Sequence, residues 1–455
     1  MADVPTSELP VAVIGAGPVG LAAAAHLLER GLESLVLEAG GEVGATVRAW
    51  GHVRLFSPWA YDVDAAARRL LVAHGWTPPD PDALPTGAEL VDAYLAPLAA
   101  TPELASRIRT GTRVLAVSRS GVDKTRTVGR AGRPYVVRTV ADGGVADVPV
   151  RAVLDASGTW GHRNPLGAAG LPAVGEDRAG AWLTGPLPDV LGTDRERFAG
   201  RHTLVVGMGH SAATTLLALV RLREQEPGTR VTWAIRGRSP ARLYGGGDAD
   251  GLPARGLLGW TLRDAVAVGA VDLVREFTVA SLATPDGGAG RLTVTGAGRD
   301  GAVVRLEVDA VVPATGFRPD LDLLREVRLD LDPAVEAPAR LAPLIDPNAH
   351  SCGTVPPHGA ALLAHPDEHL YVVGVKSYGR APTFLLATGY EQVRSIAAAL
   401  AGDVAAAERV ELALPATGVC STDLGARDAA EVAGVGFATG SAHGWSAEGQ
   451  PATTG

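Results

Sequence analysis

The chain has 455 residues, of which 46% are hydrophobic and 20% are charged. These proportions are typical of globular proteins, and at about 100–200 residues per domain the length indicates two or three domains. The formal net charge of −9, with no basic run, argues against nucleic acid as a partner. No apolar stretch reaches the about 18 residues that a membrane span needs, and Asp3 and Glu8 stand where a targeting signal would be basic. We therefore expect a cytoplasmic protein that binds small molecules and neither nucleic acid nor a membrane. Its oligomeric state is left open.

Two cysteines, Cys352 and Cys420, are the only ones in the chain. They are too few for a disulfide framework or a zinc or iron–sulfur centre, and their spacing is not that of a CxxC redox pair. No metal site is expected. Any redox chemistry therefore requires a bound organic cofactor.

The first elements form a strand, a glycine-rich turn, a helix and a second strand. The strand covers Val11 to Ile14, the turn Gly15 to Gly20, the helix Leu21 to Arg30 and the second strand Ser34 to Leu37, which ends at Glu38. This order and spacing are those of a dinucleotide-binding βαβ unit.

Each residue type in this unit has a physical role. Gly15 permits the tight turn, Gly17 lets the backbone approach a pyrophosphate, and Gly20 lets the helix pack closely on the strand. Glu38 accepts hydrogen bonds from ribose hydroxyls, and its charge disfavours a 2'-phosphate, so FAD or NAD fits this site and NADP does not. The residues predicted to bind this cofactor are Gly15, Gly17, Pro18, Gly20 and Glu38.

A helical, proline-punctuated stretch and three strands are predicted next. The helical stretch runs from Asp62 to Leu98, and the strands cover Arg113 to Ser118, Tyr135 to Val140 and Val148 to Leu154. The glycines of Asp142 to Gly144 favour a turn between the last two strands.

A second glycine motif follows the strand Leu204 to Val206, and a helix over Ala213 to Leu222 and a strand over Val231 to Ile235 come after it. This repeat of the first pattern predicts a second nucleotide site. The residues predicted to bind there are Gly207, Gly209, His210, Ser211 and Ala212.

The strand of this second unit is followed by Arg236 and Arg238 rather than by an acid. Paired guanidinium hydrogen bonds suit a 2'-phosphate, so NADPH is favoured over NADH. The alternative is that both arginines are solvated loop charges.

Two further strands end in small residues that permit close backbone approach. One covers Val308 to Pro313 and leads to Thr315 and Gly316, and the other runs from Leu370 to Gly374. We predict that Thr315, Gly316 and Gly374 contact a cofactor. An amphipathic helix over Tyr390 to Leu400 closes the fold.

These elements predict an α/β fold with two Rossmann-like dinucleotide-binding domains. Residues 1–195 form the first part of an FAD-binding domain, 196–315 an inserted NADP-binding domain and 316–402 the return segment of the FAD domain. Residues 403–455 are expected to form a flexible extension, because they are rich in Ala, Gly, Ser and Thr.

The chain resembles the class B flavin-dependent monooxygenases, which include flavin-containing and Baeyer–Villiger types. Besides both glycine motifs, the similarity lies in Asp309 to Phe317, Gly44 to Trp50 and Val53 to Pro58. It implies that Arg48 and Trp50 border the flavin and that NADPH reduces FAD, which then activates O2 to oxidise a small molecule. The catalytic candidates are Arg54, Ser57 and Lys376, each of which has a purely structural alternative.

One family feature is missing, since Phe198 to Thr203 places its histidine too early for the family's fingerprint before the second glycine motif. Two other functions therefore stay open. One is an NADPH-dependent flavin reductase or oxidase that acts on thiols or other acceptors, in which His350 activates Cys352. The other is a non-catalytic redox sensor.

Overall fold

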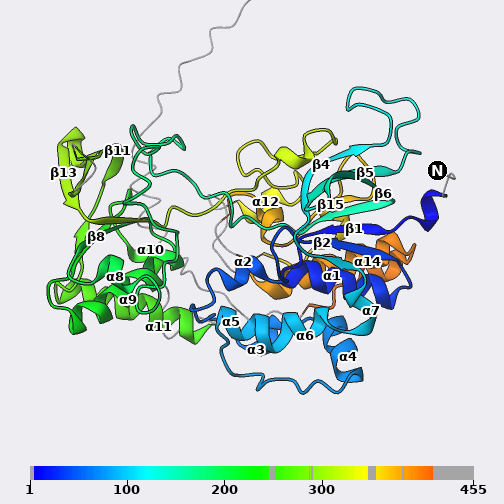
Figure 1. Cartoon of the computed structure of the whole chain (residues 1–455), viewed down its shortest axis with the longest axis horizontal. Coiled ribbons are helices and arrows are strands. Elements are labelled where there is room, and N and C mark those ends of the chain that lie inside the picture. The colour runs from blue at the N-terminus through cyan, green and yellow to red at the C-terminus, as the bar shows by residue number, and fades with distance from the viewer. Residues whose placement is uncertain are drawn as a thin grey trace, which may run out of the picture. The chain divides into compact units, whose positions relative to one another are not determined.

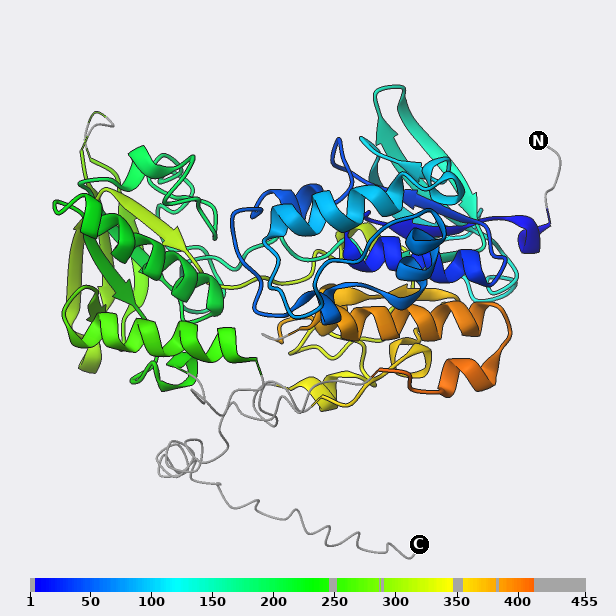
Figure 2. The same cartoon turned by 90° about the horizontal axis from the view of Figure 1, so that it is seen from below.

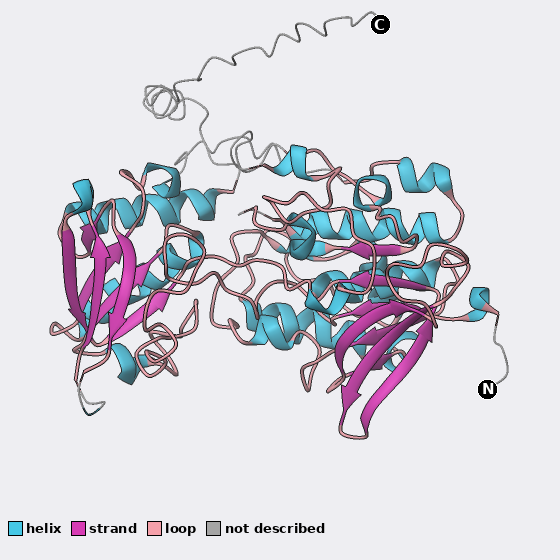
Figure 3. Cartoon of the chain, turned by 90° about the horizontal axis from the view of Figure 1, so that it is seen from above, coloured by secondary structure: helices cyan, strands magenta, loops and turns pink. Residues whose placement is uncertain are grey.

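The computed structural model describes residues 5–244, 252–285, 287, 290–346, 355–381 and 384–412. Figure 1 shows the course of the chain, and Figure 3 separates helices from strands. The described part contains two parallel sheets. Each has helices on one face and a smaller antiparallel sheet on the other. The predicted α/β fold with two Rossmann-like units is therefore confirmed.

The first parallel sheet has the strand order β15-β7-β1-β2-β3. Val11 of β1 pairs with Ser34 of β2 on one side and with Ala152 of β7 on the other. Its strands are β1 (Val11–Ile14), β2 (Ser34–Leu37), β3 (Ile108–Arg109), β7 (Ala152–Asp155) and β15 (Leu370–Val372). The last strand comes from the C-terminal third of the chain, so the return segment completes this sheet.

Both faces of the first sheet are covered, which explains why its strands are continuous apolar runs. Helices α1 (Pro18–Glu29) and α14 (Leu386–Leu400) lie side by side on one face (Figure 2). The other face packs against an antiparallel sheet with the order β4-β5-β6, through residues such as Leu37 and Val137. The strands of that sheet are β4 (Arg113–Arg119), β5 (Tyr135–Ala141) and β6 (Gly144–Val150).

The second parallel sheet has the order β10-β9-β8-β14 and comprises β8 (His202–Val206), β9 (Arg230–Ala234), β10 (Asp272–Val274) and β14 (Ala310–Pro313). Helices α9 (His210–Gln225) and α11 (Pro253–Ala267) contribute to the core on one face. The core on the other face includes the antiparallel strands β11 (Thr278–Ala283), β12 (Leu292–Ala297) and β13 (Val303–Val308).

Shorter helical segments connect these layers. They are η1 (Thr6–Glu8), α2 (Ala45–Arg48), α3 (Trp59–Asp62), α4 (Ala65–Ala73), α5 (Gly87–Leu90), η2 (Val91–Leu95), α6 (Ala96–Ala99), α7 (Pro102–Ala105), α8 (Arg195–Phe198), α10 (Ala241–Tyr244), η5 (Arg299–Gly301), η6 (Asp322–Leu324), α12 (Ala342–Ile345), α13 (Ala360–Leu363), η7 (Gly374–Tyr378) and α15 (Val404–Glu408). No helix among the described residues is long and apolar enough to span a membrane.

Three elements differ from the sequence-based expectation. The predicted strand Val148 to Leu154 is divided between β6 and β7, and the strand Val308 to Pro313 is divided between β13 and β14. In each case one residue, Arg151 or Asp309, turns the chain from an antiparallel into a parallel sheet. Residues 403–412 of the predicted flexible extension include helix α15, which packs on α14; the rest of the extension lies outside the described residues.

Candidate functional site

The first glycine turn has the geometry that a diphosphate requires. Gly15 has a φ of 99°, and a Cβ there would lie 2.9 Å from the carbonyl oxygen of Ala156. A Cβ on Gly20 would come within 1.9 Å of the Gly15 carbonyl, whereas a Cβ on Gly17 would have nothing within 4 Å. Helix α1 starts at Pro18 without a side-chain cap, so its first N–H groups are available to an anion. These residues fit the pyrophosphate of FAD.

Glu38 lies beside this turn, at the end of β2. Its Oε2 accepts a hydrogen bond from the Ala16 N–H at 2.7 Å, and its Oε1 accepts one from the Gly40 N–H at 2.7 Å. A carboxylate has about four acceptor positions, so these two bonds fix the group and leave capacity for ribose hydroxyls. The predicted role of Glu38 thus has the necessary geometry.

The second glycine turn repeats this arrangement. Gly207 has a φ of 132°, and a Cβ there would lie 2.0 Å from the carbonyl oxygen of Ala314. A Cβ on Gly209, the N-cap of α9, would have nothing within 4 Å. Because α9 begins at His210 and continues through Ser211 and Ala212, the predicted residues form the start of an uncapped helix beside an open backbone. A second dinucleotide fits here.

The two arginines predicted to hold a 2'-phosphate have different surroundings. Both are exposed after β9, and Arg236 donates to the Ala168 carbonyl at 3.3 Å. Arg238 forms an ion pair of 3.1 Å with Glu276, whose negative charge repels a phosphate. Arg236 therefore remains the better candidate for selecting NADPH.

One segment, Gly44 to Pro58, joins the two glycine turns. At its start, the Gly44 N–H donates to the Ala16 carbonyl in the first turn at 3.0 Å. Near its end, the Phe56 ring lies 5.0 Å from the ring of His210, measured between centroids, at the start of α9. This segment is the one whose sequence resembles the flavin-bordering stretches of the monooxygenases. Its two contacts bring both nucleotide motifs to the same stretch of chain.

Arg48 and Trp50 lie within this joining segment. The Arg48 guanidinium donates to Asp92 at 2.6 Å, so its charge is already paired. The half-buried Trp50 ring packs on Gly87, where an added Cβ would come within 2.8 Å of the ring. These contacts give both residues a structural role beside their predicted one.

The three predicted catalytic residues form no hydrogen bond or ion pair with one another in the described structure. Arg54 is exposed, donates to the Leu84 carbonyl and lies 3.9 Å from Glu89. The Ser57 hydroxyl donates to the buried Asp62 carboxylate at 2.7 Å. Asp62 was not singled out in the sequence, because an acid in the run Trp59 to Asp64 carries no spacing signal.

Lys376 is fully buried and has partners on β7 and in the turn after it. Its Nζ donates to Asp155 Oδ2 at 2.7 Å and to Ser157 Oγ at 3.0 Å. The ion pair joins the ends of β7 and β15 next to Ala156, whose carbonyl faces Gly15. Lys376 thus supports the first glycine turn.

Gly374 is held by a chain of buried side chains. Its N–H donates to Gln392 Oε1 at 2.8 Å, and its carbonyl accepts from Ser377 Oγ at 2.7 Å. The Gln392 amide donates to Ser377 and to His358 Nε2, at 2.9 Å each. Burial lowers the pKa of His358, which favours the neutral ring that accepts this bond.

Thr315 and Gly316 lie where the chain passes from β14 to the return segment. The Thr315 hydroxyl donates to the Asn164 carbonyl at 2.5 Å, and Arg163 forms a β-bridge with Phe317. The segment at Arg163 and Asn164, which leads toward the second sheet, is therefore bonded to the segment at Thr315 to Phe317, which leads back from it. Both lie next to the second glycine turn. The sequence did not indicate Asn164.

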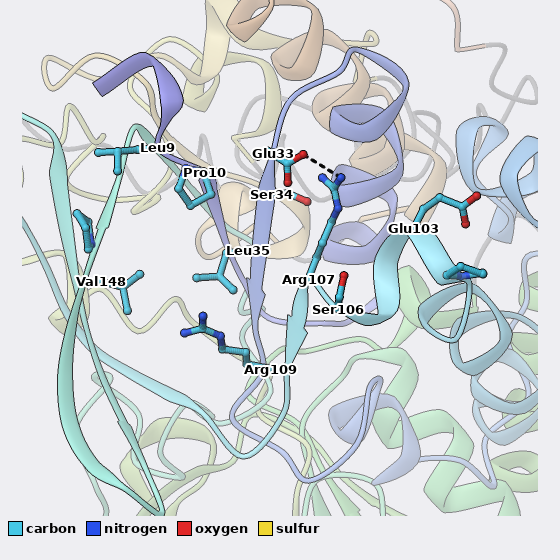
Figure 4. Close-up of a pocket in the computed structure, with 12 residues that line it drawn as sticks. Leu9, Pro10, Glu33, Ser34, Leu35, Glu103, Ser106, Arg107, Arg109 and Val148 are labelled. Carbon is cyan, nitrogen blue, oxygen red and sulfur yellow. Dashed lines mark hydrogen bonds and ion pairs between the residues drawn. The ribbon is translucent and has the colours of Figure 1, made fainter. Parts of the chain in front are cut away.

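A separate pocket of about 600 Å³ lies at the opposite, amino-terminal end of the first sheet (Figure 4). Pro10 and Ser34, which line it, stand at the starts of β1 and β2, while the glycine turn and Glu38 follow the ends of these strands. Nucleotides bind at the carboxyl ends of parallel strands. This pocket is therefore not the cofactor site.

Comparisons with known proteins agree with this geometry. Residues 10–77 match the family model of the FAD dependent oxidoreductases, whereas no curated protein sequence matches the chain. The structure of bacillithiol disulfide reductase from Bacillus cereus is similar, with a TM-score of 0.63 and 19% identity over 87% of this chain and 99% of that one. The structure of the cadaverine monooxygenase of desferrioxamine biosynthesis from Erwinia amylovora has a TM-score of 0.57 and 13% identity, over 89% of this chain and 97% of that one. A flavin-containing monooxygenase from Stenotrophomonas maltophilia has a TM-score of 0.52 and 22% identity, over 87% of this chain and 98% of that one. The chain thus has the fold of flavoproteins with two dinucleotide-binding domains.

Proposed function

We propose that this chain, an FAD-dependent oxidoreductase with two dinucleotide-binding domains, is an NADPH-dependent monooxygenase that acts on a small molecule. In the overall reaction, substrate, O2, NADPH and a proton give the oxygenated substrate, NADP+ and water. Residues 1–195 and 316–402 would bind FAD, and residues 196–315 would bind NADPH. The observation that supports this most is the segment Gly44 to Pro58, which contacts both glycine turns.

The residues of the chain bind and orient, while the flavin, when bound, supplies the redox chemistry. Gly15, Gly17 and the start of α1 would hold its pyrophosphate, and Glu38 its ribose. Arg236 would recognise the 2'-phosphate of NADPH. The contact of Phe56 with His210 supports alignment of the nicotinamide with the flavin, because it brings the joining segment to the second glycine turn.

The decisive experiment follows NADPH oxidation by the FAD-loaded protein under O2, with and without candidate substrates. A monooxygenase consumes NADPH and oxygenates substrate in equal amounts. Hydrogen peroxide without product would instead indicate an oxidase. NADPH oxidation that requires a disulfide and continues without O2 would indicate a disulfide reductase, the activity named for the Bacillus cereus relative.

Substitution of Arg236 is expected to change coenzyme preference. Arg236→Ala should lower the ratio of kcat/KM for NADPH to that for NADH about tenfold or more, because a hydrogen bond to a charged group contributes about 1.5–3 kcal/mol. Arg238→Ala is the matched control, and its effect should stay within about threefold because Glu276 already pairs with Arg238. Equal use of both coenzymes by the parent protein would contradict the assignment.

The cysteines are expected to be dispensable. Both Cys352 and Cys420 lie outside the described residues, as does His350, and their spacing is not that of a dithiol centre. Cys352→Ser, Cys420→Ser and the double variant should keep NADPH oxidation within about threefold of the parent, a difference of less than 1 kcal/mol in barrier. Loss of two or more orders of magnitude with FAD still bound would favour thiol redox chemistry instead.

A further inference from the structure

Ser57 and Asp62 form a buried pair at the end of the joining segment. The Asp62 side chain has no exposed surface, and its Oδ1 lies 2.7 Å from Ser57 Oγ. Its Oδ2 is buried and has no hydrogen-bond partner among the described residues. An ionised carboxylate would therefore leave an oxygen with negative charge unpaired in the protein interior, which is costly.

The groups around Asp62 do not offset this cost. Tyr390 donates to the main-chain carbonyl of Asp62 at 2.7 Å, and the buried Tyr94 hydroxyl accepts from the Asp64 N–H at 3.1 Å. The nearby Asp64 is a second acid, and His26 pairs with Asp64 at 2.9 Å. No ion pair with Asp62 exists in the described part of the chain. Burial accordingly raises the pKa of Asp62 to about 7.

We propose that Asp62 is a positioning residue that decides whether the Ser57 hydroxyl donates or accepts a hydrogen bond toward the bound cofactors. Ionised Asp62 takes the hydroxyl hydrogen of Ser57, which then offers only oxygen lone pairs. Protonated Asp62 donates from Oδ1 to Ser57 Oγ, so the hydrogen of Ser57 is free to point toward a ligand. The distance of 2.7 Å suits a hydrogen bond in either direction.

Protonation at Oδ1 also resolves the problem at Oδ2. In the neutral acid, Oδ2 is a carbonyl oxygen without charge, and an unpartnered carbonyl is easier to bury than an unpartnered carboxylate. One proton thus removes the buried charge of Asp62 and changes Ser57 from the donor to the acceptor of their shared hydrogen bond. Ser57 as a whole residue is 9% exposed.

The consequence for catalysis rests on the proposed function and on the predicted role of Ser57 as a catalytic residue beside the flavin. Hydride transfer from NADPH would add negative charge to a bound flavin. A hydroxyl donor at Ser57 would stabilise this charge, and a nearby carboxylate would oppose it. Flavin reduction should therefore slow as the pH rises through about 7. Asp62 acts here through Ser57 and need not touch the cofactor.

The test measures anaerobic flavin reduction by saturating NADPH between pH 5.5 and pH 8.5, a range of about 1.5 on either side of the expected pKa. The parent rate should fall about tenfold across this range, as expected for one lost hydrogen bond to a charged group. Asp62→Asn and Ser57→Ala should both give rates without this inflection, while Ser57→Thr, which keeps the hydroxyl, should retain it. Asp64→Asn, the neighbouring buried acid, should also retain it. An inflection that persists in Asp62→Asn would overturn the proposal.

A second measurement does not need FAD or activity. Infrared difference spectra of the apoprotein should show a protonated carboxyl band that disappears near pH 7 and is missing in Asp62→Asn. Asp62 holds its proton in the folded chain up to about pH 7 and in the unfolded chain only up to about pH 3.8, so its own contribution to stability falls as the pH rises through this window. The difference in unfolding free energy between the parent and Asp62→Asn should therefore change with pH in that direction. If the band titrates but parent reduction is independent of pH, the role of Asp62 is refuted while the monooxygenase function stands. If the protein binds no FAD, the proposed function fails, and the band still reports on Asp62.

Discussion

Replacing Lys376 with methionine is expected to lower the free energy of unfolding by about 3–5 kcal/mol, because it leaves the Asp155 carboxylate buried without its cation. Both side chains are fully buried, at 0% exposure, and their charged atoms are 2.7 Å apart. Denaturant unfolding followed by circular dichroism measures the loss. FAD retention should fall with it, since the pair supports the turn at Ala156 that faces Gly15.

Two further variants separate the buried charge from a general packing defect. In Lys376→Met/Asp155→Asn no charge is left unpaired, so the double variant should recover at least half of the lost stability. Lys124, the other lysine of the chain, is exposed and donates to the Arg325 carbonyl. Lys124→Met should change stability by no more than about 0.5 kcal/mol. A Lys376→Met protein as stable as the parent, or a double variant less stable than Lys376→Met, would contradict the role of the ion pair.

Two alanine substitutions in the first glycine turn should have opposite kinds of effect. Gly17→Ala places its methyl group in open space, so the apoprotein should fold normally. The methyl group would stand where the pyrophosphate approaches, and loss of a backbone hydrogen bond to a phosphate should weaken FAD binding about tenfold to a hundredfold. Gly20→Ala, with 1.9 Å between the new Cβ and the Gly15 carbonyl, should instead disrupt folding.

Titration of apoprotein with FAD, followed by flavin fluorescence, measures the first effect, and thermal unfolding of the apoprotein measures the second. Gly209→Ala, the equivalent change in the second turn, is the matched control. It should leave FAD affinity unchanged and raise the KM for NADPH. Parent-like FAD affinity in Gly17→Ala would show that the pyrophosphate does not bind over this turn.

The sequence by itself determined the local units of this protein. Strands β1 and β2 match the predicted ranges, and both glycine turns, with the helices after them, lie where the spacing placed them. The reason is that the turn, the helix start and the buried strand are set by neighbouring residues. The φ values of 99° at Gly15 and 132° at Gly207 favour glycine, and strands buried on both faces favour continuous apolar runs.

Only the tertiary structure decided which distant residues meet. Asp155 and Lys376 are 221 positions apart, and the contacts of Phe56 with His210 and of Gln392 with Gly374 likewise depend on how the return segment and the second sheet come back to the first. The same holds for the Ser57–Asp62 bond, which is local, whereas Asp62 is covered by α14, whose Tyr390 donates to the Asp62 carbonyl. Burial and pairing arise from the sum of many packed segments, and no residue pattern along one segment encodes them.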